Sequence, residues 1–118
     1  MLTLAHKQLK VYQFALTLIV KVYEHTKSYP KEEQYGLVSQ LRRAAVSVCS
    51  NLAEGSARLS RPEKRRFYEM SRSSLVEVDT QVEISLLLNF LKKNEIADLE
   101  NYLESIFKML SKMIDNLK

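Results

Sequence analysis

The sequence predicts an all-α fold: an antiparallel up-down four-helix bundle with a long third helix, in one domain that covers residues 1–118. The first reason is composition, because two Gly and two Pro among 118 residues are too few for the turns of a β-sheet. The second is periodicity, because apolar residues recur three and four positions apart in four successive segments. The third is that the scarce Gly and Pro residues mark two of the three joints between those segments.

The first helix is expected over about residues 5–27. Val11, Ala15, Leu18 and Val22 recur at helical spacing, which predicts an amphipathic helix with one buried face. The helix should end before Pro30, because the residue that precedes a proline disfavours helical conformation.

Pro30 should open the second helix, which we expect to run toward Gly55. Proline fits a first helical turn, and Glu32 and Glu33 suit the positive end of the helix dipole. Gly36 should weaken this turn. Gly55 is interpreted as a left-handed C-terminal cap, with a close contact to its backbone as the alternative reason for a glycine there.

The third helix has the clearest start signal. Ser60 and Glu63 have the spacing of a capping box, and Pro62 is tolerated in the first turn, where backbone amides have no helical partner. Nothing interrupts the helical pattern before about Lys92.

The fourth helix follows a turn at Lys93 and Asn94. Its apolar residues alternate three and four positions apart, as in the seam of a coiled coil or helix bundle. They are Ile96, Leu99, Leu103, Ile106, Leu110, Met113 and Leu117.

The second helix is apolar over more than half of its circumference. Leu37, Leu41 and Leu52 belong to one stripe, but Val46 and Cys49 extend it sideways, which is wider than one bundle core needs. We interpret the excess as a surface for self-association. The alternative is a helix that lies in the centre of the monomer.

A line of polar residues follows the opposite side of the second helix. It consists of Gln40, Arg43, Ser47, Ser50 and Glu54. As an active site, its serines would need a base, and neither His6 nor His25 has a suitable partner within its own segment. We therefore favour a polar packing strip between helices or subunits over a catalytic site.

Basic residues concentrate in residues 58–72, which hold six basic and two acidic side chains. Helical spacing places Arg61, Arg65 and Arg72 on one side of the third helix, where they should face solvent. Arginine suits phosphate recognition. The candidate nucleic-acid contacts are Arg42, Arg58, Arg61, Lys64, Arg65, Arg66 and Arg72. The alternative is a solvated face, or pairing with Glu54, Glu63 and Glu69 within or between subunits.

Other classes of protein are disfavoured. The single cysteine, Cys49, and two isolated histidines predict neither a disulfide framework nor a metal site, and no motif indicates a cofactor. No apolar run approaches the length of a membrane span, and the first residues do not resemble a signal peptide. We expect a cytoplasmic protein without a membrane partner.

Several runs of residues resemble those of one family. They are Pro30–Leu37, Gln40–Ser47, Ser50–Gly55 and Arg58, followed by Ser60, Glu63, Arg66-Phe67 and Ser71–Glu77. The chain resembles the 23S rRNA intervening-sequence proteins, which are also called four helix bundle proteins. It departs from their pattern at Leu52, where Ile is common, and at Arg72-Ser73-Ser74, where a small residue, Gly and Ser are common. Neither departure disturbs the fold that the resemblance implies.

The resemblance implies a four-helix bundle that assembles as a homopentamer, and it implies no established reaction. The chain is also distantly similar to the accessory proteins of diversity-generating retroelements, which partner a reverse transcriptase and nucleic acid. Our first hypothesis is a non-enzymatic oligomer that binds RNA or DNA through the arginines. The second is a scaffold that recruits a nucleic-acid enzyme, and the third is an enzyme built on the polar line.

Overall fold

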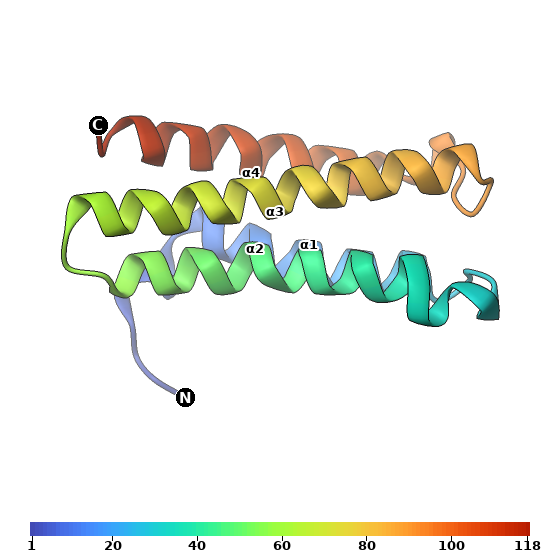
Figure 1. Cartoon of the computed structure of the whole chain (residues 1–118), viewed down its shortest axis with the longest axis horizontal. Coiled ribbons are helices and arrows are strands. Elements are labelled where there is room, and N and C mark those ends of the chain that lie inside the picture. The colour runs from blue at the N-terminus through green and yellow to red at the C-terminus, as the bar shows by residue number, and fades with distance from the viewer.

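The computed structural model describes residues 1–118 and contains four α-helices and no strand (Figure 1). The long helices are α1 (Lys10–Thr26), α2 (Ser39–Ala57), α3 (Arg61–Leu87) and α4 (Ala97–Asp115). Shorter pieces precede three of them: 3₁₀ turns at Ala5–Gln8, Lys31–Glu33 and Lys93–Glu95, and a π-helical segment at Gln34–Val38.

The helices run alternately up and down, and each packs on the helices before and after it, while α1 also packs on α4. This arrangement confirms the predicted antiparallel bundle. Both termini and the α2–α3 connection lie at one end of the molecule, and the other two connections lie at the opposite end (Figure 1). None of the helices combines the length and apolar character that crossing a membrane requires.

The core is one cluster of 24 buried apolar residues contributed by all four helices. The first five residues of the predicted seam of α4 are confirmed, because all of them are buried: Ile96, Leu99, Leu103, Ile106 and Leu110. At the C-terminal end Met113 and Leu117 are half-buried and pack against the core, and Ile114, which the prediction did not include, is fully buried. The coiled-coil-like alternation gives way there to the ordinary 3.6-residue helical period.

The first helix starts later than its periodicity predicts. Residues 5–8 form a separate 3₁₀ turn, and Leu9 adopts an extended conformation before α1 begins at Lys10. The turn holds no buried residue, so no apolar contact compensates for the cost of continuing the helix.

The second helix also starts later, at Ser39. Pro30 opens a 3₁₀ turn instead, and Gly36 has non-helical backbone angles (φ −111°, ψ −110°) within the π-helical segment. The carboxylate of Glu33 accepts a hydrogen bond from the backbone N–H of Leu37 (3.3 Å) and supports this kinked entry.

Gly55 lies inside α2 and is not a left-handed cap; the helix continues to Ala57, and Arg58 is extended. The alternative reason is confirmed. A Cβ atom at position 55 would lie 2.8 Å from the ring of Tyr68 and 2.9 Å from the Cβ of Phe67, both on α3. Glycine is therefore required because α2 and α3 approach each other closely there.

The third helix begins as predicted, since the hydroxyl of Ser60 accepts a hydrogen bond from the backbone N–H of Glu63 (3.2 Å). It ends at Leu87, earlier than the predicted Lys92. Asn89 adopts a left-handed conformation (φ 62°), and the chain turns so that Phe90 packs on Tyr29 and Leu91 is buried. With 27 residues, α3 is still the longest helix, about 40 Å long.

Candidate nucleic-acid interface

The antiparallel fold separates charge along the bundle. The half that carries the termini and the α2–α3 connection comprises residues 1–18, 49–74 and 107–118, and it holds eleven Lys and Arg against four Asp and Glu. The other half comprises residues 19–48 and 75–106, and it holds seven Lys and Arg against ten Asp and Glu. The two halves therefore carry formal charges of +7 and −3. We call them the basic end and the acidic end.

Most of the predicted basic contacts gather at the basic end. Arg58, Arg61, Lys64, Arg65 and Arg66 all stand at or just after the α2–α3 connection. Arg72 lies on the same helix, about 9 Å beyond Arg66 along its axis. Arg42 is not part of the cluster, because it lies near the start of α2 in the acidic end.

Two of these cations contact backbone carbonyls near helix ends. Arg61 donates through Nη2 to the carbonyl oxygen of Asn116 (2.7 Å), just beyond α4. Lys64 donates through Nζ to the carbonyl oxygen of Ser56 (3.0 Å) in the last turn of α2. Both contacts place a positive charge at the negative end of a helix dipole.

The other arginines contact aromatic rings, a hydroxyl or carboxylates. Arg58 lies over the ring of Phe67 (4.6 Å to the centroid) and 4.0 Å from Glu54. Arg65 lies 3.8 Å from Glu69. Two of the three acids considered as partners are thus near an arginine, in exposed or half-exposed pairs of little energetic value. Arg72 donates to the hydroxyl of Ser111 (3.0 Å) and lies over Phe107.

The side chains do not all face solvent as expected. Lys64, Arg65 and Arg72 are half-buried, because their stems pack between helices, whereas Arg58, Arg61 and Arg66 are exposed. Arg66 makes no ion pair or hydrogen bond within the chain. A guanidinium has five N–H donors, so an arginine with one contact keeps donors for a phosphate.

Two of the five residues of the polar line of α2, Gln40 and Ser47, contact α3. The hydroxyl groups of Ser47 and Ser74 are 2.9 Å apart, and Asn51 donates to Ser47. The amide of Gln81 donates to Gln40 (3.4 Å). These contacts give Gln40 and Ser47 partners on the neighbouring helix, as expected for a packing strip. Arg43, Ser50 and Glu54 are exposed.

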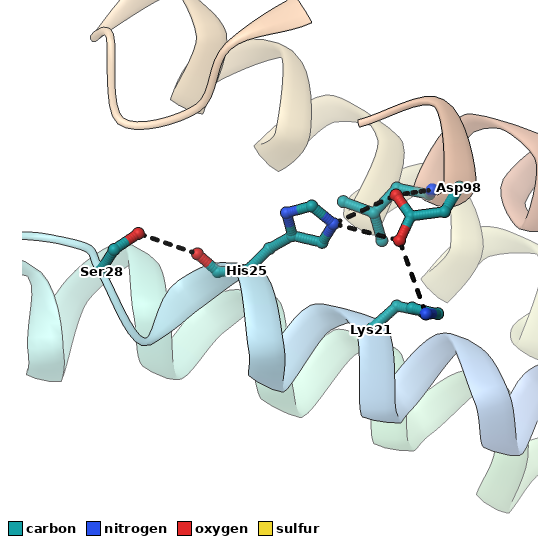
Figure 2. A network of polar contacts seen from close by, with 5 residues as sticks. Lys21, His25, Ser28 and Asp98 are labelled. Atoms are coloured by element: carbon teal, nitrogen blue, oxygen red, sulfur yellow. Dashed lines mark hydrogen bonds and ion pairs between the residues drawn. The ribbon is translucent and has the colours of Figure 1, made fainter. Parts of the chain in front are cut away.

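The histidines lie away from this line. His6 packs edge-on against Tyr12, and the Nε2 atom of His25 lies 3.1 Å from Asp98 Oδ1. Figure 2 shows that the imidazole reaches from α1 to the carboxylate at the start of α4, beside Lys21 (3.8 Å). Local sequence reasoning missed this cluster because Asp98 is 73 residues from His25.

Asp98 is the carboxylate whose titration is most clearly perturbed by its surroundings. Partial burial by itself would raise its pKa, but the backbone N–H of Leu99, the His25 ring and the Lys21 ammonium together hold the pKa below its ordinary value. No cluster of three His, Cys, Asp or Glu side chains is arranged to hold a metal ion.

A family model, 23S rRNA-intervening sequence protein, matches residues 7–112. The chain belongs to this family. The match spans all of α1, α2 and α3 and most of α4, so it covers the helices that form the basic end.

The crystal structure of a protein from Bacteroides thetaiotaomicron is similar to the structure of this chain. It is described as a protein with unknown function from the S23 ribosomal protein family. The TM-score is 0.78 over 88% of this chain and 97% of that one, at 17% sequence identity. At that identity the likeness supports the fold alone. No curated protein matches the chain.

Proposed function

We propose that the protein is a cytoplasmic, non-enzymatic, self-associating helical bundle that binds RNA or DNA through its basic end. The observation that carries the proposal is the separation of charge into +7 and −3 halves. A nucleic acid is a polyanion, and a surface with excess cations attracts it through its phosphates. Arg58, Arg61 and Arg66 are the exposed contacts of this surface.

The basic end supports phosphate binding better than catalysis. Its cations contact carbonyls, rings and few carboxylates, so most of their charge is uncompensated. Ser47 contacts the hydroxyl of Ser74 and the amide of Asn51, and both histidines lie elsewhere. A nucleophile beside a base, which hydrolysis or group transfer would need, has no counterpart in this arrangement.

Two exposed apolar patches support self-association. One, the α1–α2 patch, lies on α1 at the α1–α2 side of the bundle and includes Leu16 and Val20, which are 44% and 54% exposed. The other lies in the groove between α3 and α4 and includes Val76 and Phe107. Because α1–α2 and α3–α4 form opposite sides of the bundle, contact between the two patches joins subunits head to tail. Such contacts form a closed ring when the rotation between successive subunits closes, and an open filament when it does not; the family resemblance suggests a ring of five subunits.

Nucleic-acid binding is tested with a labelled ribosomal RNA hairpin and a matched DNA duplex, by fluorescence anisotropy across a salt series. Arg61→Gln/Arg66→Gln removes two charges from the basic end. Lys31→Gln/Lys92→Gln removes two exposed charges from the acidic end and is the matched control. We expect binding to weaken with salt, and the first variant to reduce the slope of log K against log salt by about 2.

The control variant should bind as the wild type does. Equal losses in both variants would mean that net charge alone drives binding, and the basic end would not be the site. If neither nucleic acid binds at low salt, the proposal is wrong and a scaffold that recruits a nucleic-acid enzyme takes its place.

Self-association is tested by the mass in sedimentation equilibrium. Val20→Glu puts a charge into the α1–α2 patch and should shift the mass toward the monomer, because a charge buried in an apolar contact is costly. Asn101→Glu adds the same charge at an exposed position of α4 in neither patch and should leave the mass unchanged. A wild-type protein that is monomeric at tens of micromolar would contradict this part of the proposal.

A further inference from the structure

A shallow groove crosses the outer side of α2 at a distance from the basic cluster. Its volume is about 690 Å³, and it extends from Tyr23 on α1, past the π-helical segment, to the middle of α2. Its lining residues are Tyr23, Gln34, Tyr35, Val38, Ser39, Arg42, Arg43, Val46, Ser47, Ser50 and Asn51.

The groove is selectively lined for an anion. It contains two arginines and no carboxylate, although it lies in the half of the molecule that is acidic overall. Arg43 is exposed and makes no ion pair or hydrogen bond within the chain. Hydroxyl and amide groups of serines, Gln34 and Asn51 supply further neutral donors.

Arg42 is held in place at the side of the groove. Its Nε donates to the hydroxyl of Thr26 (3.0 Å), and its guanidinium lies over the ring of Tyr23 (4.3 Å to the centroid). These two contacts fix the stem and one face of the guanidinium, so its terminal N–H groups are ordered before any ligand arrives. A preordered donor loses less entropy on binding than a mobile one.

Tyr35 supplies an uncovered aromatic ring at one end of the groove. It is 92% exposed, far more than any other tyrosine or phenylalanine of the chain. It precedes Gly36 in the π-helical segment, which the Glu33 carboxylate holds through the Leu37 N–H. An exposed ring beside arginines is the combination with which proteins bind unpaired bases and their phosphates.

We propose that this groove binds single-stranded nucleic acid, with a base stacked on Tyr35 and the adjoining phosphates on Arg43 and Arg42. The inference rests on the proposed function, to which it adds a second site and a class of ligand. Bases in a duplex are stacked on their neighbours and do not present a face to a protein side chain, whereas an unpaired base does.

The position of the groove fits a strand that also reaches the basic end. A second polar groove shares Ser47 and Asn51 with the first and continues over α3 to Arg66, although Glu69 and Glu77 also line it. Arg43 and Arg58 are 15 residues apart on and just beyond α2, about 22 Å along the helix axis. An extended strand of a few nucleotides spans that distance, so one ligand can contact both sites.

The test uses the full chain, a labelled dT₁₂ strand and a twelve-base-pair duplex. Tyr35→Ala should weaken dT₁₂ binding about 5- to 100-fold, and Tyr35→Phe, which keeps the ring, should bind like the wild type. Neither change should alter duplex affinity. Arg43→Gln should lower the salt slope for dT₁₂ by about 1, whereas Lys31→Gln, which removes a nearby charge outside the groove, should not.

A spectroscopic reporter separates stacking from simple charge attraction. The chain contains no Trp, so Tyr35→Trp places a single indole at the proposed stacking position. We expect dT₁₂ to quench its emission, and a deoxyribose phosphate twelve-mer without bases to leave the emission unchanged.

Three results would overturn the inference. If Tyr35→Ala binds dT₁₂ like the wild type while Arg61→Gln/Arg66→Gln loses binding, the groove is not a site but the proposed function stands. If neither nucleic acid binds any variant, both fall. If Tyr35→Ala lowers the sedimentation mass of the free protein, the groove is a contact between subunits.

Discussion

The two ends of the bundle handle their charged groups differently. At the acidic end, the contacts of Asp98 with His25 and Lys21 join two different helices, and Lys93 contacts Glu100. At the basic end, the ion pairs of Arg58, Arg65 and Lys118 are local ones, three or four residues apart, while Arg61 and Lys64 contact backbone carbonyls. A carboxylate cancels the field of a cation, whereas a neutral partner orients the cation without cancelling it.

This difference between the two ends indicates which charged side chains are available to bind a partner. At the acidic end, the contacts of Asp98 with His25 and Lys21 join α4 to α1 (Figure 2). Asp98 and His25 are 73 residues apart in the sequence. The ion pairs of the basic end join residues only three or four positions apart. Arg61, Lys64 and Arg66 are in none of them, so these three cations can bind a ligand without giving up a carboxylate partner. Substitutions that disturb the packing at one end should therefore change the free energy of unfolding by a different amount from substitutions that remove ion pairs at the other end.

The largest effect is expected at Gly55, where α2 and α3 are closest. Gly55→Ala puts a Cβ at 2.8–2.9 Å from Tyr68 and Phe67, and these buried or half-buried side chains must move. Overpacking of this kind costs about 1–3 kcal/mol, more than alanine gains as the better helix former. We expect a net loss of about 1–2 kcal/mol in the free energy of unfolding, measured by urea denaturation at one fixed protein concentration.

Gly36→Ala is the matched control at the acidic end. The added Cβ would meet only the end of the flexible Glu33 side chain, at 3.2 Å, and should change the free energy of unfolding by less than about 1 kcal/mol. Equal losses at both glycines would show that backbone freedom, and not helix packing, determines the glycine at position 55.

Gly55 also illustrates what sequence reasoning can and cannot provide. Periodicity predicted four helices, and the Ser60 cap and the α4 seam followed from local spacing. The same reasoning favoured a helix end for Gly55, because a glycine that follows an apolar helix usually caps it, and gave a close contact to its backbone as the alternative. Its actual role depends on the Tyr68 ring, which only the packing of α3 brings next to it.

A smaller effect is expected at the ion pairs of the acidic end. Asp98→Asn removes the negative charge that His25 and Lys21 contact. Because the side chain is 36% exposed, solvent screens the interaction, and we expect a loss of about 0.5–1 kcal/mol at pH 7. Asp115→Asn, at a more exposed pair with Lys118, should have no measurable effect.

The pH dependence of the Asp98 contribution has a definite sign. Its pKa is lower in the folded protein than in the unfolded chain, so ionisation stabilises the fold. The contribution is complete above the unfolded pKa of about 3.9 and is lost as the pH falls through the folded pKa. The difference between wild type and Asp98→Asn should therefore shrink from pH 7 toward pH 2. An equal difference at both pH values would contradict the assignment.

The candidate site was less predictable than the fold. The six basic residues of 58–72 were evident as a cluster. The separation of charge also needs five lysines that join the cluster only when the helices fold back on each other: Lys7, Lys10, Lys108, Lys112 and Lys118. Arg42 looked like part of the same set, yet α2 carries it to the opposite half. Arg42, Arg43, Ser47 and Ser50 of the groove were singled out from the sequence. Tyr35 had no signal, because its exposure depends on the kinked segment around Gly36.

Only a small loss of stability is expected from Arg61→Gln/Arg66→Gln. Arg66 has no partner within the chain, and the Arg61 contact with the Asn116 carbonyl is exposed, so the free energy of unfolding should fall by less than about 1 kcal/mol. The same double variant is expected to lose nucleic-acid affinity steeply. That combination distinguishes cations kept for a ligand from cations that hold the fold, because a structural role would lower stability and binding together. A loss of stability above about 2 kcal/mol, in a urea titration at fixed protein concentration, would place these arginines with Asp98 as part of the fold, and the contrast between the two ends would disappear.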